Sequence, residues 1–91
     1  MTMEKIKDLP RPQDRLHWAC RRGMLELDVL LSNFLKEAYP ALTADDQAYF
    51  AAFLTYPDPD LMAWIMGRET PDNPHLAAMA VKIHEHARNR F

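Results

Sequence analysis

The stretch Met-Leu-Glu-Leu-Asp-Val-Leu-Leu-Ser-Asn-Phe-Leu-Lys-Glu-Ala, residues 24–38, carries the strongest periodic pattern in the chain. Pro40 follows it closely and ends it, because the residue before a proline is pushed out of the helical region. The stretch therefore predicts an amphipathic helix. Its apolar residues recur at spacings of three and four, which places them on one helix face: Leu27, Leu30, Leu31, Phe34, Leu35 and Ala38.

Helical patterns continue on both sides of this stretch. Downstream, Thr43 precedes Asp46 by three residues, which is close to a capping box and predicts a helix start. Two further starts are predicted where a capping residue precedes a proline, at Asp58-Pro59 and Asn73-Pro74. Upstream, a helix is expected from Gln13, with one face formed by Leu16, Ala19, Cys20 and Gly23.

These patterns predict an all-α protein, a compact five-helix bundle. No segment alternates with period two for long enough to form a strand. The chain has 91 residues, which fits a single domain over residues 13–91, preceded by a flexible arm at residues 1–12. The helix that begins near Asp58 is expected to end near Gly67. Expected inward residues of the last three helices are Tyr49, Phe50, Phe53, Leu54, Leu61, Trp64, Ile65, Leu76, Met79, Ala80, Ile83 and Ala87.

The composition excludes several kinds of site. The two glycines, Gly23 and Gly67, are too far apart for a glycine-rich phosphate loop, and the single cysteine, Cys20, excludes a disulfide framework or a two-cysteine redox motif. His84 and His86 are two residues apart on an expected helix and point to different sides, so no metal site is predicted. Cys20 and both tryptophans are expected in the core. No catalytic residue is predicted.

Charge and hydropathy narrow the choice of partners. The net charge is −2, which gives no overall signature for nucleic acid. Basic residues gather before residue 24 and acidic residues between 24 and 72, a polarity that suits docking on a partner of complementary charge. The longest apolar run, residues 48–54, is far shorter than the ~20 residues needed to span a bilayer. We therefore expect no membrane insertion and a cytoplasmic location.

The segment from Arg15 to Asp28 is unusually rich in charged and aromatic residues. Gly23 lies between two helical patterns and would let their axes meet at an angle. Glu26 would then lie in the first turn of the second helix, where the helix dipole favours a carboxylate. Two interpretations stay open on these residues: a helix–turn–helix corner stabilised by its own charges, or an exposed corner that docks on another protein.

Three segments together carry a resemblance to a known family. Arg22-Gly-Met-Leu-Glu26 is an R-G-x-x-E motif, and it lies inside a longer matching stretch from His17 to Asp28. Leu42-Thr-Ala-Asp-Asp46 resembles the family's helix start, and Asp58-Pro-Asp-Leu-Met-Ala-Trp-Ile-Met66 resembles its D-x-D-L-x-x-W-[IL]-M segment. Residues 15–88 resemble the succinate dehydrogenase flavinylation factor family (SdhE), also described as FAD assembly factors.

The resemblance implies a five-helix assembly factor, not an enzyme. Such factors bind the flavoprotein subunit of succinate dehydrogenase, and in some lineages that of fumarate reductase. They promote covalent attachment of FAD to a histidine of that subunit, so no cofactor is expected to be stably bound here. Arg22, Gly23 and Glu26 would contact the partner near its flavin site. Residues chosen because they are adjacent to this motif are Arg15, His17, Arg21 and Asp28.

Three alternatives remain open. The first is an antitoxin-like regulatory role. The second is a small helical module that binds nucleic acid, supported only by the basic N-terminal third. The third is weak direct binding of FAD by the chain itself.

Overall fold

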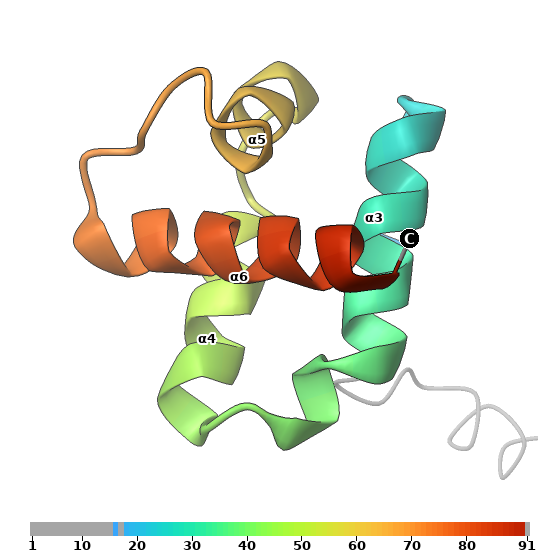
Figure 1. Cartoon of the computed structure of the whole chain (residues 1–91), viewed down its shortest axis with the longest axis vertical. Coiled ribbons are helices and arrows are strands. Elements are labelled where there is room, and N and C mark those ends of the chain that lie inside the picture. The colour runs from blue at the N-terminus through green and yellow to red at the C-terminus, as the bar shows by residue number, and fades with distance from the viewer. Residues whose placement is uncertain (1–15, 17, 91) are drawn as a thin grey trace, which may run out of the picture.

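The computed structural model describes residue 16 and residues 18–90, and within them the fold is helical throughout (Figure 1). Its elements are α3 (Leu25–Glu37), the 3₁₀ turn η1 (Tyr39–Ala41), α4 (Ala44–Phe53), α5 (Asp58–Ile65) and α6 (Pro74–Arg90).

The predicted all-α class is confirmed, but the described residues contain four α-helices, not five. Residues 13–15 and 17 of the helix expected from Gln13 lie outside them. Of that helix, Leu16, Trp18 and Ala19 are helical, and the chain turns at Cys20. The expected arm, residues 1–12, also lies outside the described residues.

Helix α3 matches the prediction within one residue at each end. Met24 is its N-cap and Ala38 its C-cap, and the amide of Ala38 donates to the carbonyl of Phe34. The residues of the expected stripe that are buried are Leu27, Leu31, Phe34 and Leu35, while Leu30 is half-buried. The periodic pattern alone was therefore enough to place this helix and its inner face.

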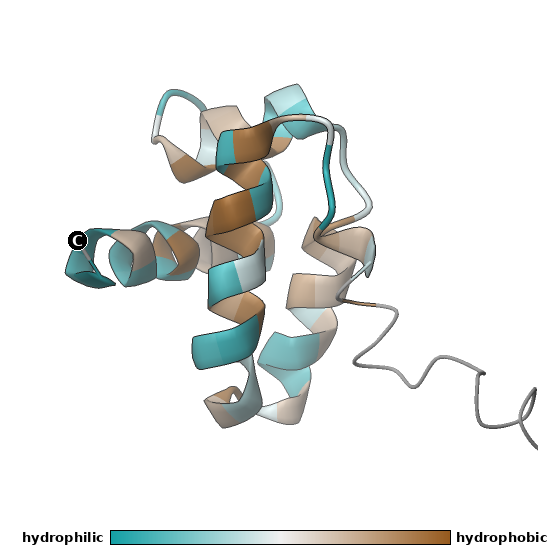
Figure 2. Cartoon of the chain, turned by 90° about the vertical axis from the view of Figure 1, so that its right-hand side faces the viewer, coloured by the Kyte–Doolittle hydropathy of each residue, from teal (hydrophilic) through white to brown (hydrophobic). Residues whose placement is uncertain are grey.

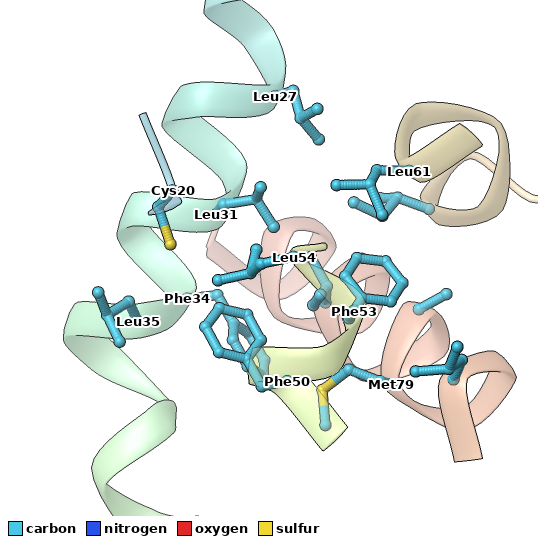
Figure 3. Close-up of a cluster of buried hydrophobic side chains, with 14 residues drawn as sticks. Cys20, Leu27, Leu31, Phe34, Leu35, Phe50, Phe53, Leu54, Leu61 and Met79 are labelled. Atoms are coloured by element: carbon cyan, nitrogen blue, oxygen red, sulfur yellow. The ribbon is translucent and has the colours of Figure 1, made fainter. Parts of the chain in front are cut away.

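Helix α6 crosses α3 and α4 and runs below α5, so it packs against all three (Figure 1). The core that these helices share is apolar throughout (Figure 3). The rings of Phe34 and Phe50 lie 5.3 Å apart at its centre and join α3 to α4. Its members are Cys20, Leu27, Leu31, Phe34, Leu35, Phe50, Phe53, Leu54, Leu61, Ile65, Leu76, Met79, Ala80 and Ile83.

Two of the three predicted caps are confirmed. The Thr43 hydroxyl accepts from the amide of Asp46 at 3.1 Å, and the side-chain oxygen of Asn73 accepts from the amide of His75 at 2.8 Å. Asp58 is not a cap: Pro57 occupies that position, and Asp58 is the first residue of α5. The Asp58 carboxylate instead binds an arginine from a distant part of the chain, and this long-range bond replaces the local one.

Gly67 ends α5, as predicted. Its φ of +79° lies in the left-handed region, which glycine adopts without the steric cost of a Cβ. The amide of Arg68 donates to the carbonyl of Ala63 at 2.9 Å, and that of Gly67 to the carbonyl of Trp64 at 3.2 Å. This pair of bonds is a Schellman motif, and it turns the chain from α5 towards α6.

A polar cluster fixes the far end of α3 against the end of α6. The Arg90 guanidinium donates to both oxygens of the Glu37 carboxylate, and His86 Nε2 lies 3.0 Å from Glu37 Oε1. The hydrogen bond from Arg90 lowers the pKa of Glu37 below its ordinary value. This cluster links the last residue of α3 to the end of α6.

Candidate functional site

The R-G-x-x-E motif spans the corner that leads into α3. The amide of Arg21 donates to the carbonyl of Trp18 at 3.0 Å, which turns the chain, and Arg22 and Gly23 follow in the turn. Glu26 lies in the first turn of α3. The predicted corner is therefore present, with Arg22 in the turn and Glu26 in the first turn of α3.

The Arg22 side chain is bound inside the molecule. Its Nε donates to Asp58 Oδ1 at 2.7 Å, and Nη1 donates to the carbonyls of Ala19 at 2.6 Å and Leu54 at 3.1 Å. Nη2 donates to the carbonyl of Tyr56 at 2.9 Å. The guanidinium thus ties the corner to the loop between α4 and α5, using four of its five N–H donors.

This geometry changes the role expected for Arg22. Its side chain is only 14% exposed, and Asp58 neutralises its charge. Within the folded chain Arg22 positions the corner, because removing it would free three carbonyl groups and one carboxylate from their donor. Contact with a partner was predicted for Arg22, and only its remaining Nη2 hydrogen is available for such a contact.

Cys20 lies beneath the corner and is fully buried against α3 (Figure 3). Burial raises the pKa of its thiol to about 12, an effect that the nearby Arg22 charge only partly opposes. The thiol is therefore neutral at physiological pH and does not act as a nucleophile. The expectation that Cys20 belongs to the core is confirmed.

Gly23 lies on the exposed outer side of the corner, which corrects two expectations. It does not belong to the buried face of Leu16, Ala19 and Cys20. Its φ is not in the left-handed region, and a Cβ built on it would meet no atom within 4 Å. The fold of the free chain therefore does not require glycine here, and any such requirement comes from outside the chain.

Glu26 is exposed at the positive end of α3, as predicted. Its carboxylate makes no hydrogen bond or ion pair with any residue that the structure describes. Glu26 and Gly23 together present an open carboxylate and an open stretch of backbone at one corner.

Three residues flank this corner on the side of the preceding turn. The Arg21 guanidinium lies 5.4 Å from the centroid of the Trp18 ring, and its Nε is 4.0 Å from Asp28 Oδ2. Ser32 donates to the other Asp28 oxygen at 3.2 Å. Trp18 is 65% exposed, so the expectation that it belongs to the core is wrong. An exposed tryptophan beside an arginine is a typical contact residue, and its helical spacing gave no sign of this role.

Arg15 and His17 lie outside the described residues. Among the described residues, no group of His, Cys, Asp and Glu side chains is arranged to hold a metal ion. Within the same part of the chain, no helix is both long enough and apolar enough to cross a bilayer.

Comparisons with known proteins agree on one family. Residues 14–87 match the family model Sdh5, described as the flavinator of succinate dehydrogenase. A protein of Vibrio cholerae named FAD assembly factor SdhE is 51% identical over 72 residues, which cover 79% of this chain and 84% of that protein. Proteins with the same name from Colwellia psychrerythraea and Pseudomonas aeruginosa are 55% and 51% identical over 69 residues.

A solved structure shows the same fold. The solution structure of a UPF0350 protein is 49% identical and superposes with a TM-score of 0.71, covering 84% of this chain and 81% of the other. The resemblance inferred from the motif and its two accompanying segments is thereby confirmed. The chain belongs to the Sdh5 family, the flavinator of succinate dehydrogenase.

Proposed function

We propose that this chain is an assembly factor that binds the flavoprotein subunit of succinate dehydrogenase and promotes covalent attachment of FAD to it. The observation that supports this most directly is the family match over residues 14–87, together with relatives named FAD assembly factors. The flavoprotein subunit of fumarate reductase is a second partner within this proposal, and the cytoplasm is the proposed location.

The corner has the properties that such a partner contact requires. Arg22 holds it in one conformation from within, so little conformational entropy is lost when it docks. Gly23 lets a partner backbone approach closely, and the Glu26 carboxylate accepts charge-assisted hydrogen bonds. Arg21, Asp28 and Trp18 extend the contact on one side. Arg15 and His17 stay in this proposal as predicted contacts.

The factor acts by holding its partner rather than by catalysis. The relatives are named assembly factors, which agrees with the expectation that the chain is not an enzyme. The motif offers a bound arginine, a glycine and a carboxylate that has no partner among the described residues, and none of these is an activated nucleophile. We propose that the partner carries out the bond formation itself, in a conformation that the factor stabilises.

Reconstitution tests this function. The purified flavoprotein subunit without flavin is incubated with FAD, with and without this protein, and covalent flavin is measured by in-gel fluorescence. We expect the protein to raise flavin incorporation and Gly23→Arg to abolish that increase, because the new side chain fills the space that the partner backbone needs. Ala48→Arg, at an exposed position of α4, is the matched control. Equal incorporation with and without the wild-type protein would overturn the proposal.

A further inference from the structure

An apolar groove opens directly beside the motif. It lies between the first half of α3, the end of α5 and the end of α6, and encloses about 580 Å³. Figure 2 shows apolar ribbon on the upper half of α3, next to α5 and α6. The lining of this α3/α5/α6 groove includes Leu25, Glu26, Val29, Met66, His84 and Arg88.

The groove gathers exposed apolar side chains that the fold does not use. Leu25 is 75% exposed, Met66 51% and Val29 44%, although all three are large and hydrophobic. Single exposed residues of this kind are ordinary, but a contiguous set in a hollow marks a binding surface. Covering them would remove apolar area from water, which is the main favourable term in protein association.

Charged groups of opposite sign lie on the two rims. Glu26 lines the α3 side, while Arg88 and His84 line the α6 side. Neither Glu26 nor Arg88 has a hydrogen-bond or ion-pair partner among the described residues. An occupant that complements this rim carries a basic group near α3, an acidic group near α6, and apolar groups between them.

The groove and the corner form one continuous surface, because Glu26 belongs to both. A partner that binds the Glu26 carboxylate therefore lies at the edge of the groove. A specific interface buries roughly 800 Å² on each partner and has an apolar centre with a polar rim. In such an interface the polar corner would form part of the rim, and the groove would form the apolar centre.

We propose that the α3/α5/α6 groove receives an amphipathic helix of the flavoprotein partner. Its apolar residues, spaced three, four and seven apart, pack on Leu25, Val29 and Met66. A basic residue on one edge pairs with Glu26, and an acidic residue on the other edge pairs with Arg88. Three helices already wall the groove, so a fourth helix packs there by the same ridge-and-groove contacts. This inference rests on the proposed function and assigns the partner's contact element.

Affinity measurements test the groove separately from the motif. Binding of the purified flavin-free flavoprotein subunit of succinate dehydrogenase is measured for wild type, Val29→Lys, Met66→Lys and the control Ala48→Lys. Both groove positions are well exposed, so urea unfolding should show near-wild-type stability. We expect each groove variant to weaken binding at least about tenfold and to lower flavin incorporation at limiting factor. The Ala48→Lys protein should behave as wild type.

Photo-crosslinking identifies the occupant. A benzophenone side chain placed at residue 29 should crosslink to one helical segment of the subunit, with a basic residue on one edge and an acidic residue on the other. Crosslinks confined to residues 1–15 of the same chain, to a second copy, or to a loop of the subunit would overturn the proposal. So would wild-type affinity in both groove variants. If both groove variants bind with wild-type affinity but Glu26→Ala lowers flavin incorporation, the proposed function stands and the groove proposal falls. If the wild-type protein does not bind the subunit, both proposals fall.

Discussion

Arg22 and Glu26 are the two charged ends of one five-residue motif, and the fold uses them in opposite ways. Arg22 is turned inward and gives four hydrogen bonds to the corner and to the α4–α5 loop. Glu26 is turned outward and has no partner among the described residues. The motif looks like a single contact site, but its two charged residues have different roles. Arg22 stabilises the corner, and Glu26 is exposed on its surface.

The surroundings of the two residues differ in the same way. Around Arg22 the polar groups are satisfied, and Cys20 below it is buried and neutral. Around Glu26 the surface is an open apolar groove. Changes on the Arg22 side should therefore act through stability, and changes on the Glu26 side through binding.

The largest expected effect is that of Arg22→Ala on stability. The substitution leaves the partly buried Asp58 carboxylate and three carbonyl groups without their donor, which should cost about 3 kcal/mol in the free energy of unfolding. Urea unfolding of the purified protein measures this. Arg22→Lys should restore only part of the loss, because one ammonium has three donors and cannot reproduce the four hydrogen bonds of the guanidinium. An unfolding free energy equal to wild type in Arg22→Ala would show that the bound arginine is not structural.

Glu26→Gln should change binding and leave stability nearly unaltered. Losing a charge-assisted hydrogen bond at the interface should weaken affinity for the flavoprotein subunit about tenfold, or roughly 1.4 kcal/mol. Asp45→Asn is the matched control, since Asp45 is also an exposed acid in the first turn of a helix. Both variants lose the same small dipole interaction, so their stabilities should agree within about 0.5 kcal/mol. Equal affinities in the two variants would remove Glu26 from the interface.

Cys20 gives a pH test of the Arg22 side. Its pKa is about 12 in the folded chain, against about 8.5 in an unfolded one. Between these values the unfolded state loses the thiol proton and the folded state keeps it, so stability falls as pH rises. Between pH 8 and pH 10 wild type should lose about 2 kcal/mol more than Cys20→Ala, measured by urea unfolding. Parallel pH profiles of the two proteins would mean that the thiol is more accessible than its burial indicates.

The sequence was sufficient for the parts of this molecule that depend on local pattern. The apolar stripe of α3, the caps at Thr43 and Asn73 and the end of α5 at Gly67 are set by residues a few positions apart. The error at Asp58 has a physical reason. A capping bond and the bond to Arg22 compete for the same carboxylate, and the second joins residues 36 positions apart.

The errors at the site have a related origin. Gly23 and Trp18 were both expected to face inward, but the chain turns at Cys20 and both residues are exposed. The groove depends on three helices that meet only in the folded chain. Leu25 and Val29 lie outside the buried stripe of α3. No local sequence pattern distinguishes residues that line a binding groove from ordinary exposed residues.

Substitutions of the two glycines should have the smallest effects, and they separate stability from binding most directly. Gly67→Ala should lower the free energy of unfolding by about 1 kcal/mol, because its φ of +79° is strained for any residue with a Cβ, and should leave partner affinity unchanged. Gly23→Ala should change stability by less than about 0.5 kcal/mol, since its Cβ would meet nothing. If a partner backbone approaches Gly23, that same methyl group should weaken affinity several-fold. Two chemically identical substitutions would then act on different properties, one on the fold and one on the interface, and wild-type affinity in Gly23→Ala would place the partner elsewhere on the corner.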